Sequence, residues 1–135
     1  MANADRPSGF TPLRHAFGGT SFRANPYRLE SGYATGIFTG DMVILSSGVL
    51  AIGAQDSAVP LGIFNGCQYT ATDGSVVFSK FWPASTATLG SADAVAFIYD
   101  DPGIVYSVQT ETGSTYAKAT HDGNVYDIEL DHAGN

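Results

Sequence analysis

The sequence predicts an all-β fold, either a small antiparallel β-barrel or a β-sandwich, with an extended N-terminal arm. Short apolar runs with period-two alternation recur along the chain, and glycine-containing turn dipeptides separate them. No window of about 11 residues has an apolar stripe at helical spacing. The 135 residues, 44% hydrophobic and 14% charged, suit one folded domain. We expect residues 1–32 to form the arm and residues 33–135 to form the β domain.

The first part of the β domain is a series of predicted strands joined by turns. The strands are expected near residues 34–38, 42–45, 49–52, 61–64, 67–71 and 75–82. The turns between them are expected at Gly40-Asp41, Ser46-Ser47-Gly48, Asn65-Gly66 and Asp73-Gly74. Asn-Gly and Asp-Gly are strong tight-turn dipeptides, so the last two turns predict hairpins.

The strand predicted at 75–82 alternates Val77, Ser79 and Phe81 with residues that face the other way. Pro83 lacks a backbone N–H, so it is expected to end this strand or to lie at an edge. The later strands are predicted at 94–99, 104–110 and 125–130, and residues 114–120 allow at most one or two helical turns. Short strands with turn residues between them are typical of a sandwich or barrel.

The arm, residues 1–32, combines aromatic residues with prolines and glycines and has no sustained period. A solvated tail has little use for so many aromatic side chains, so we expect the arm to lie on another molecule. Fully extended, its first ~28 residues would reach about 90 Å. The alternative is that the arm follows its own domain as extra edge strands.

The charge distribution separates the arm from the rest of the chain. The net charge is −7 and the pI is near 4.5, which disfavours binding to a nucleic acid backbone. All four arginines nevertheless lie in the first 28 residues, where Asp5 is the one acidic residue. No apolar stretch approaches the ~20 residues that span a bilayer, and Cys67 has no cysteine partner. We expect synthesis in a cytosol and no membrane anchor.

Adjacent carboxylates at Asp100 and Asp101 raise the question of catalysis. They precede Pro102 and Gly103 between two predicted strands, and Asp, Pro and Gly are all turn residues. Neighbouring side chains at a strand end diverge, whereas an acid–base pair must flank one substrate. The turn is therefore the preferred interpretation, and a small acidic hydrolase that uses one of these aspartates is the alternative.

Other residue types with catalytic or ligand-binding chemistry follow no motif that predicts an enzyme. The three histidines lack metal-ligand spacing, and Asp122-Gly123-Asn124 lacks the spacing of a calcium loop. Cys67 is expected to be a buried or half-buried strand residue. We expect no catalytic residue, cofactor or metal.

Trp82, Phe81 and Phe78 allow a second function. Exposed aromatic rings stack on sugars, so these residues would suit a carbohydrate- or surface-binding β module if they faced solvent. Core packing is the preferred interpretation for Phe78 and Phe81, whereas the position of Trp82 stays open. An exposed Trp82 would favour the carbohydrate-binding alternative.

Several stretches resemble the head decoration, or cement, proteins of tailed bacteriophages. The resemblance begins with MANADRPSGFTPLRHAFGG and continues through YRLESGYATGIFTGDMVIL and the Leu61-Gly62-Ile63 segment. It extends through FWPAST and YDDPGIVYSVQ, so that it covers roughly residues 1–110. Each motif consists largely of turn residues and alternating apolar residues. The order of the motifs along the chain carries the resemblance.

The resemblance implies a β-rich virion protein on the outer surface of the capsid, usually a homotrimer, which holds neighbouring major capsid protein subunits together. The arm would then be the part that contacts the major capsid protein, through aromatic anchors and arginines that pair with carboxylates. Removal of residues 1–28 is expected to abolish capsid binding and to leave a folded β domain. The expected capsid-binding residues are Arg6, Phe10, Arg14, Phe17, Phe22, Arg23, Tyr27 and Arg28.

Overall fold

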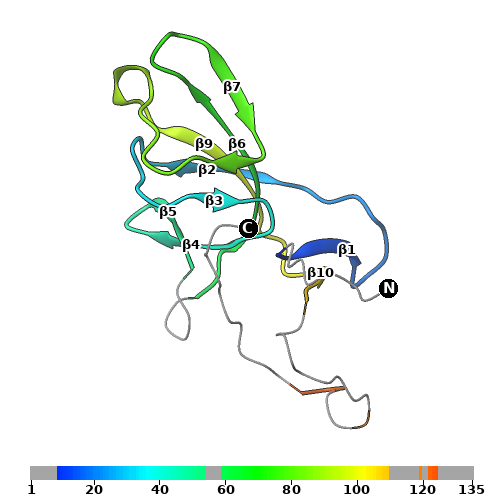
Figure 1. The fold of residues 1–135 in the computed structure, drawn as a ribbon. Helices are drawn as coiled ribbons and strands as arrows, with labels where there is room; N and C mark the ends of the chain where they lie inside the picture. Colours follow the sequence, from blue (N-terminus) through cyan, green and yellow to red (C-terminus); the bar gives the residue numbers. More distant parts are fainter. Residues whose placement is uncertain (1–8, 54–58, 110–118, 120–121, 125–135) are drawn as a thin grey trace, which may run out of the picture.

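The computed structural model describes residues 9–53, 59–109, 119 and 122–124 (Figure 1). These residues contain ten β-strands, a short 3-10 helix at Leu89–Ser91 and no α-helix. All strand pairings among them are antiparallel. The all-β prediction is therefore confirmed, although the strands of the described residues do not close into a barrel.

Three sheets make up the fold. The largest contains six strands in the order β2-β9-β6-β4-β5, with β7 paired to β6 beside this path. Its strands are β2 (Asn25–Leu29), β4 (Met42–Ser46), β5 (Val49–Ile52), β6 (Gly62–Thr70), β7 (Val76–Ser79) and β9 (Ala94–Tyr99). The two-stranded sheets pair β1 (Thr11–His15) with β10 (Ile104–Ser107), and β3 (Ile37–Phe38) with β8 (Phe81–Trp82).

The core lies on the inner face of the six-stranded sheet. This sheet curls, so that β2 and β5 from opposite ends of the strand order contact each other. Ile37 and Trp82 are paired neighbours in the small β3–β8 sheet, and both are fully buried. The larger sheet supplies the other fully buried side chains, among them Leu29, Val43, Leu50, Phe64 and Ile98. Burial of these apolar groups is the main favourable term in folding.

The central strand β6 replaces two predicted strands and the Asn65-Gly66 turn between them. It is continuous from Gly62 to Thr70 and pairs with β9 along much of its length. The pairing register shifts between Phe64 and Gly66, which indicates a β-bulge at Asn65. Gly66 has φ of +154°, and a Cβ there would lie 3.0 Å from the Ser79 carbonyl oxygen. The Asn-Gly dipeptide thus bends a strand instead of ending it.

The predicted strand at 75–82 is divided at Lys80 into β7 and β8. The division breaks the predicted alternation, because Phe78 and Phe81 are both exposed while Trp82 is buried. The prediction that Phe78 and Phe81 pack in the core is therefore wrong. β8 ends at Trp82, as predicted from Pro83.

The N-terminal segment contributes two strands to its own domain. β1 pairs with β10, and β2 is an edge strand of the main sheet whose Leu29 is in the core. For residues 11–15 and 25–29 the alternative interpretation, extra edge strands on the same domain, describes the structure. The expected boundary between arm and β domain, at residue 32, lies after β2. The predicted arm therefore includes a strand whose Leu29 is in the core of the β domain.

Most of the remaining predicted elements agree with the structure where it describes them, but the strand predicted at 34–38 is formed only at its end, as β3. β4, β5 and β9 match the predicted strands closely, and the turns at Gly40-Asp41, Ser46-Ser47-Gly48 and Asp73-Gly74 are present. β10 is shorter than predicted and ends at Ser107. The predicted strand at 125–130 and most of the segment 114–120 lie outside the described residues.

Candidate binding surface on the N-terminal ribbon

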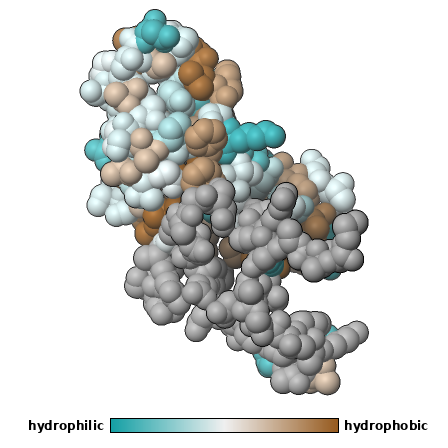
Figure 2. Space-filling model, in the orientation of Figure 1, coloured by the Kyte–Doolittle hydropathy of each residue, from teal (hydrophilic) through white to brown (hydrophobic). Residues whose placement is uncertain are grey.

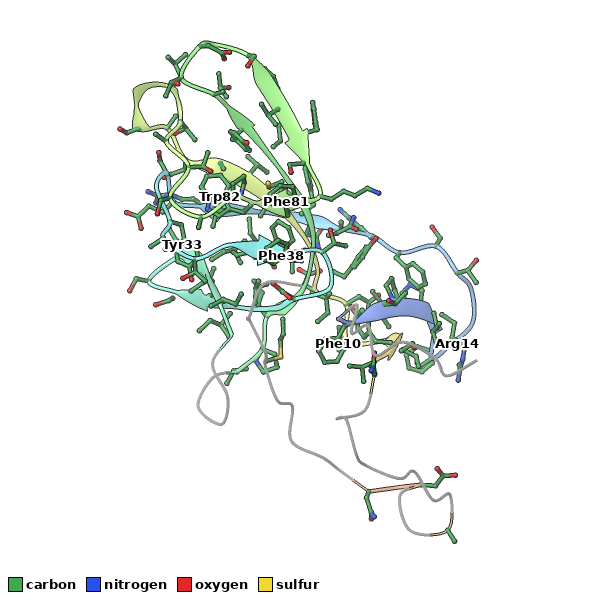
Figure 3. All side chains as sticks on the ribbon, viewed as in Figure 1. Phe10, Arg14, Tyr33, Phe38, Phe81 and Trp82 are labelled. Carbon is green, nitrogen blue, oxygen red and sulfur yellow. The ribbon has the colours of Figure 1, made fainter. Side chains whose placement is uncertain are left out.

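Two segments form a unit that we call the N-terminal ribbon: residues 10–24, with β1 and the loop at residues 16–24, and residues 101–107, with the turn before β10 and β10 itself. It lies beside the main sheet, and Figure 3 shows Phe10 and Arg14 on it, apart from the labelled aromatic residues of the main body. The Phe10 backbone N–H donates to the Gly40 carbonyl oxygen at 2.9 Å, and its ring packs edge-to-face against Tyr106 at 6.1 Å. The hydrogen bond to Gly40 attaches the start of the ribbon to the body, and the contact with Tyr106 packs Phe10 against β10.

Backbone hydrogen bonds fix the loop at residues 16–24 to the ribbon. The Ala16 N–H donates to the Gly103 carbonyl oxygen at 2.7 Å, and the His15 N–H donates to the Gly19 carbonyl oxygen at 3.0 Å. Phe17 lies between these two attachments, and its side chain is 96% exposed. The loop therefore holds a large aromatic ring in solvent on a fixed backbone.

Apolar and basic side chains occur together on the exposed surface of the ribbon. The pairing register of β1 shifts between Pro12 and Arg14, and Leu13 at this irregularity is 54% exposed. Arg14 and Arg23 are also exposed. A guanidinium group pairs with carboxylates in a bidentate geometry, and an exposed phenyl ring fills an apolar pocket. This combination suits a protein surface that carries both an apolar pocket and acidic groups.

The predicted anchor residues divide into exposed and internally bound side chains. Phe17, Arg14 and Arg23 are available at the surface. Phe10 packs on Tyr106, and the predicted anchor Arg6 lies outside the described residues. The other predicted residues make internal contacts: Phe22 with His15 and Tyr99, Tyr27 with Asp100, and the exposed Arg28 with Asp93.

Asp100 and Asp101 have structural roles at the connection between β9 and β10. The Asp101 carboxylate accepts a hydrogen bond from the Gly103 N–H at 2.8 Å, and its carbonyl oxygen accepts one from Ile104. This geometry confirms the predicted turn. Sequence patterns gave no sign of the second role, in which Asp100 accepts hydrogen bonds from the Asn25 amide at 2.8 Å and the Tyr27 hydroxyl at 2.6 Å.

The hydrogen bond between Tyr27 and Asp100 changes the acidity of both groups. It stabilises the carboxylate, so the pKa of Asp100 lies below its usual value, and the Asn25 bond acts in the same direction. The same bond and burial raise the pKa of Tyr27. An ionised Asp100 thus holds β2 against the end of β9, and its oxygens already have partners.

The two phenylalanines of β7 and β8 are exposed, against the prediction, whereas Trp82, whose position was left open, is buried. Trp82 is fully buried, and its indole N–H donates to the Tyr33 carbonyl oxygen at 3.2 Å. Phe78 is 72% exposed, and Phe81 is 45% exposed and stacked on Phe38. Figure 2 shows apolar atoms along the side of the molecule where β7 lies. The buried Trp82 removes the basis of the predicted sugar platform at that residue.

The described residues offer few groups for other chemistry. Cys67 is buried in β6, as predicted, and burial raises the pKa of its thiol to about 11. Among the described residues there is no group of three or more His, Cys, Asp or Glu side chains placed to hold a metal ion. In the same part of the chain no helix has the length and apolar character to cross a membrane.

Comparison of the chain with protein-family models, with curated proteins and with solved structures found no match. The functional interpretation therefore depends on the residues and their geometry.

Proposed function

We propose that this protein is a head decoration protein of a tailed bacteriophage. It binds the outer surface of the capsid and holds neighbouring major capsid protein subunits together, and so stabilises the head. It acts without enzymatic activity, cofactor or metal, and without binding nucleic acid or membrane. It is made in the host cytoplasm and resides on the outside of the virion. The motif order across residues 1–110 supports this proposal from the sequence.

The observation that supports the proposal best is the exposed Phe17 on the N-terminal ribbon. A phenyl ring that is 96% exposed buries very little apolar area in its own chain, and a partner pocket would supply that burial. Arg14 and Arg23 lie on the same ribbon and add positive charge to a chain whose net charge is −7. A surface of this kind recognises a protein that presents carboxylates around an apolar pocket.

The ribbon replaces the long free arm as the proposed contact with the capsid. Phe22 and Tyr27 make internal contacts, so they support the ribbon instead of acting as anchors. Truncation of one exposed aromatic anchor costs about 2 kcal/mol or more of binding energy. One such contact binds weakly, whereas three linked copies multiply the affinity by about 10² to 10⁴ when all engage at once. A homotrimer would therefore turn a weak contact into durable attachment.

The exposed face of β7 is the surface that we assign to contact between copies. Val76 and Phe78 lie on this face and are largely exposed. Residues 75–82 carry no carboxylate and a single charged residue, Lys80. In a chain with a net charge of −7, two copies meet with least repulsion where acidic groups are absent. Sedimentation of the isolated protein measures its assembly state.

Substitution of Phe17 tests the proposed function. Removal of residues 1–28 is unsuitable, because it would also remove β1 and most of β2. We expect Phe17→Ser to weaken co-sedimentation with purified, undecorated phage heads by tenfold or more, since about 2 kcal/mol of binding is lost. Val59→Ser is the matched control, because Val59 is 89% exposed and lies outside the ribbon.

The two variants separate a binding defect from a folding defect. Both remove a solvent-exposed apolar side chain, so both should unfold at about the same denaturant concentration as the parent protein. Undiminished binding of the Phe17→Ser protein to heads that the parent protein decorates would refute the role of the ribbon. Absence of binding by the parent protein itself would refute the proposed function.

A further inference from the structure

His15 ends β1 with both nitrogens of its ring facing oxygen atoms. Nε2 lies 2.9 Å from the carbonyl oxygen of Ser21, and Nδ1 lies 3.5 Å from Oδ2 of Asp101. A carbonyl oxygen and a carboxylate both act as hydrogen-bond acceptors. A neutral imidazole has one N–H to donate, whereas an imidazolium has two. Both contacts are favourable at the same time only when the ring is protonated.

These two contacts join three segments of the N-terminal ribbon. Ser21 belongs to the loop at residues 16–24, which displays Phe17, and Asp101 belongs to the turn between β9 and β10. The Phe22 ring lies 5.6 Å from the imidazole, measured between ring centroids, and covers it from the same loop. The His15 side chain therefore adds two contacts to the backbone hydrogen bonds that hold the loop beside the turn.

We propose that protonation of His15 fixes the loop carrying Phe17 against the turn between β9 and β10, so that mild acid orders the binding surface of the ribbon and higher pH loosens it. The effect on capsid binding depends on the proposed function. The effect on the loop is a property of the isolated protein and is measured without capsids.

Among the other charged groups near His15, the Arg14 cation opposes protonation of the ring, but Arg14 is exposed, so solvent and salt screen its effect. On β1 itself, the Arg14 guanidinium contacts the His15 carbonyl oxygen at 3.5 Å. Tyr99 packs edge-to-face with the Phe22 ring, and Asp100 is held by Asn25 and Tyr27. The group opposite the ring nitrogen is thus the Asp101 carboxylate, which stabilises the imidazolium and repels the lone pair of a neutral Nδ1.

The contact is present at low pH and lost as pH rises, because protonation of the histidine creates it. Imidazole side chains change charge between about pH 5 and 8, where carboxylates stay ionised. The side chains of His15 and Asp101 are 20% and 45% exposed, so solvent screens their attraction. For a pair of this kind we expect about a two- to fivefold change in the opening equilibrium of the loop.

Hydrogen exchange of the Ala16 amide tests the proposal directly, since this N–H bonds to the Gly103 carbonyl oxygen across the same junction. Exchange is followed by NMR at pH 5.5 and pH 8, with the intrinsic pH dependence of exchange removed and amides of the central strand β9 as the reference for global opening. We expect the protection of Ala16 relative to β9 to be about two- to fivefold greater at pH 5.5.

Two variants remove the pH dependence in different ways. Asp101→Asn removes the charge and keeps an oxygen that can accept from the Gly103 N–H, and His15→Gln replaces the imidazole with an uncharged amide. Both should show equal relative protection of Ala16 at the two pH values. Asp73→Asn is the control, because Asp73 caps a turn through Ser75 in the β6–β7 hairpin and should leave the pH dependence intact.

The outcomes separate this inference from the proposed function. Equal relative protection at pH 5.5 and 8 in the parent protein, or full pH dependence in Asp101→Asn, would overturn the role of His15. A pH-dependent loop in a protein whose Phe17→Ser variant binds heads undiminished would preserve the inference and refute the assignment of Phe17 to capsid binding.

Discussion

The contact between Asp100 and β2 gives the sharpest test of how the N-terminal segment is held. Asp100 accepts hydrogen bonds from the Tyr27 hydroxyl at 2.6 Å and the Asn25 amide at 2.8 Å. A hydrogen bond to a buried charged group contributes about 1.5–3 kcal/mol, and partial exposure lowers this toward 1 kcal/mol for each bond. We therefore expect Asp100→Ala to lower the free energy of unfolding by about 2 kcal/mol, and Tyr27→Phe to lower it by about 1 kcal/mol.

Denaturant unfolding followed by tryptophan fluorescence measures these changes. Trp82 is the one tryptophan in the sequence and is fully buried, so its emission reports loss of the core. The double variant should lose about 1 kcal/mol less than the sum of the single losses, because both substitutions remove the same bond. Asp101→Asn is the matched control on the neighbouring carboxylate, and at neutral pH we expect it to change stability by less than about 0.5 kcal/mol.

The pH dependence of the same measurement has a definite sign. The Tyr27 hydrogen bond holds the pKa of Asp100 below its usual value in the folded protein. The contribution of the ionised Asp100 to the free energy of unfolding is therefore complete above the unfolded-state pKa of about 4. This contribution is lost as pH falls through the lowered pKa of the folded state. The difference in free energy of unfolding between the parent protein and the Asp100→Ala variant should become smaller in acid. A difference that stays constant from pH 6 to pH 2, or strictly additive losses, would refute this account.

Two further predictions concern the sheet. Gly62→Ala places a Cβ 2.2 Å from the Tyr99 carbonyl oxygen, so it should lower the free energy of unfolding in denaturant by about 2–3 kcal/mol. Gly74→Ala has open space at a positive φ and should lower it by about 1 kcal/mol. Equal losses in the two variants would contradict the close approach of β6 and β9. Phe78→Ser should reduce self-association in sedimentation by tenfold or more and leave stability unchanged. An unchanged association constant would remove β7 from the contact between copies.

Strand positions were predictable wherever local chemistry was sufficient. β4, β5 and β9 follow runs of apolar residues, and in the predicted turn at Asp73-Gly74 the Asp73 carboxylate accepts a hydrogen bond from the Ser75 N–H. The turn at Asp101 forms for the same reason, since the aspartate side chain bonds to backbone two residues later. In these segments the interactions that select the conformation lie within a few residues of each other.

Predictions failed where the outcome depended on a distant partner. Asn65-Gly66 bends a strand because β6 continues to pair with β9 on both sides of the bulge. The bend at Lys80 reverses the faces of Phe81 and Trp82, because Trp82 pairs with Ile37 from a segment about 45 residues earlier. Alternation within 75–82 carries no information about that partner.

The candidate binding surface shows the same division. The basic and aromatic character of the first 28 residues is a property of the sequence, and so is the acidity of the rest. Which aromatic ring reaches solvent was not predictable, since Phe22 packs on Tyr99 and Tyr27 bonds to Asp100, both more than 70 residues away, while Phe17 has no such burial.

By itself, the sequence determined that this chain forms an all-β domain with turns at defined dipeptides, because alternation and turn chemistry act over a few residues. Only the tertiary structure decided that the N-terminal segment adds strands to its own sheets and that Phe17 projects from them. Those features depend on strand pairing and side-chain contacts between segments far apart in the chain, which no local pattern encodes.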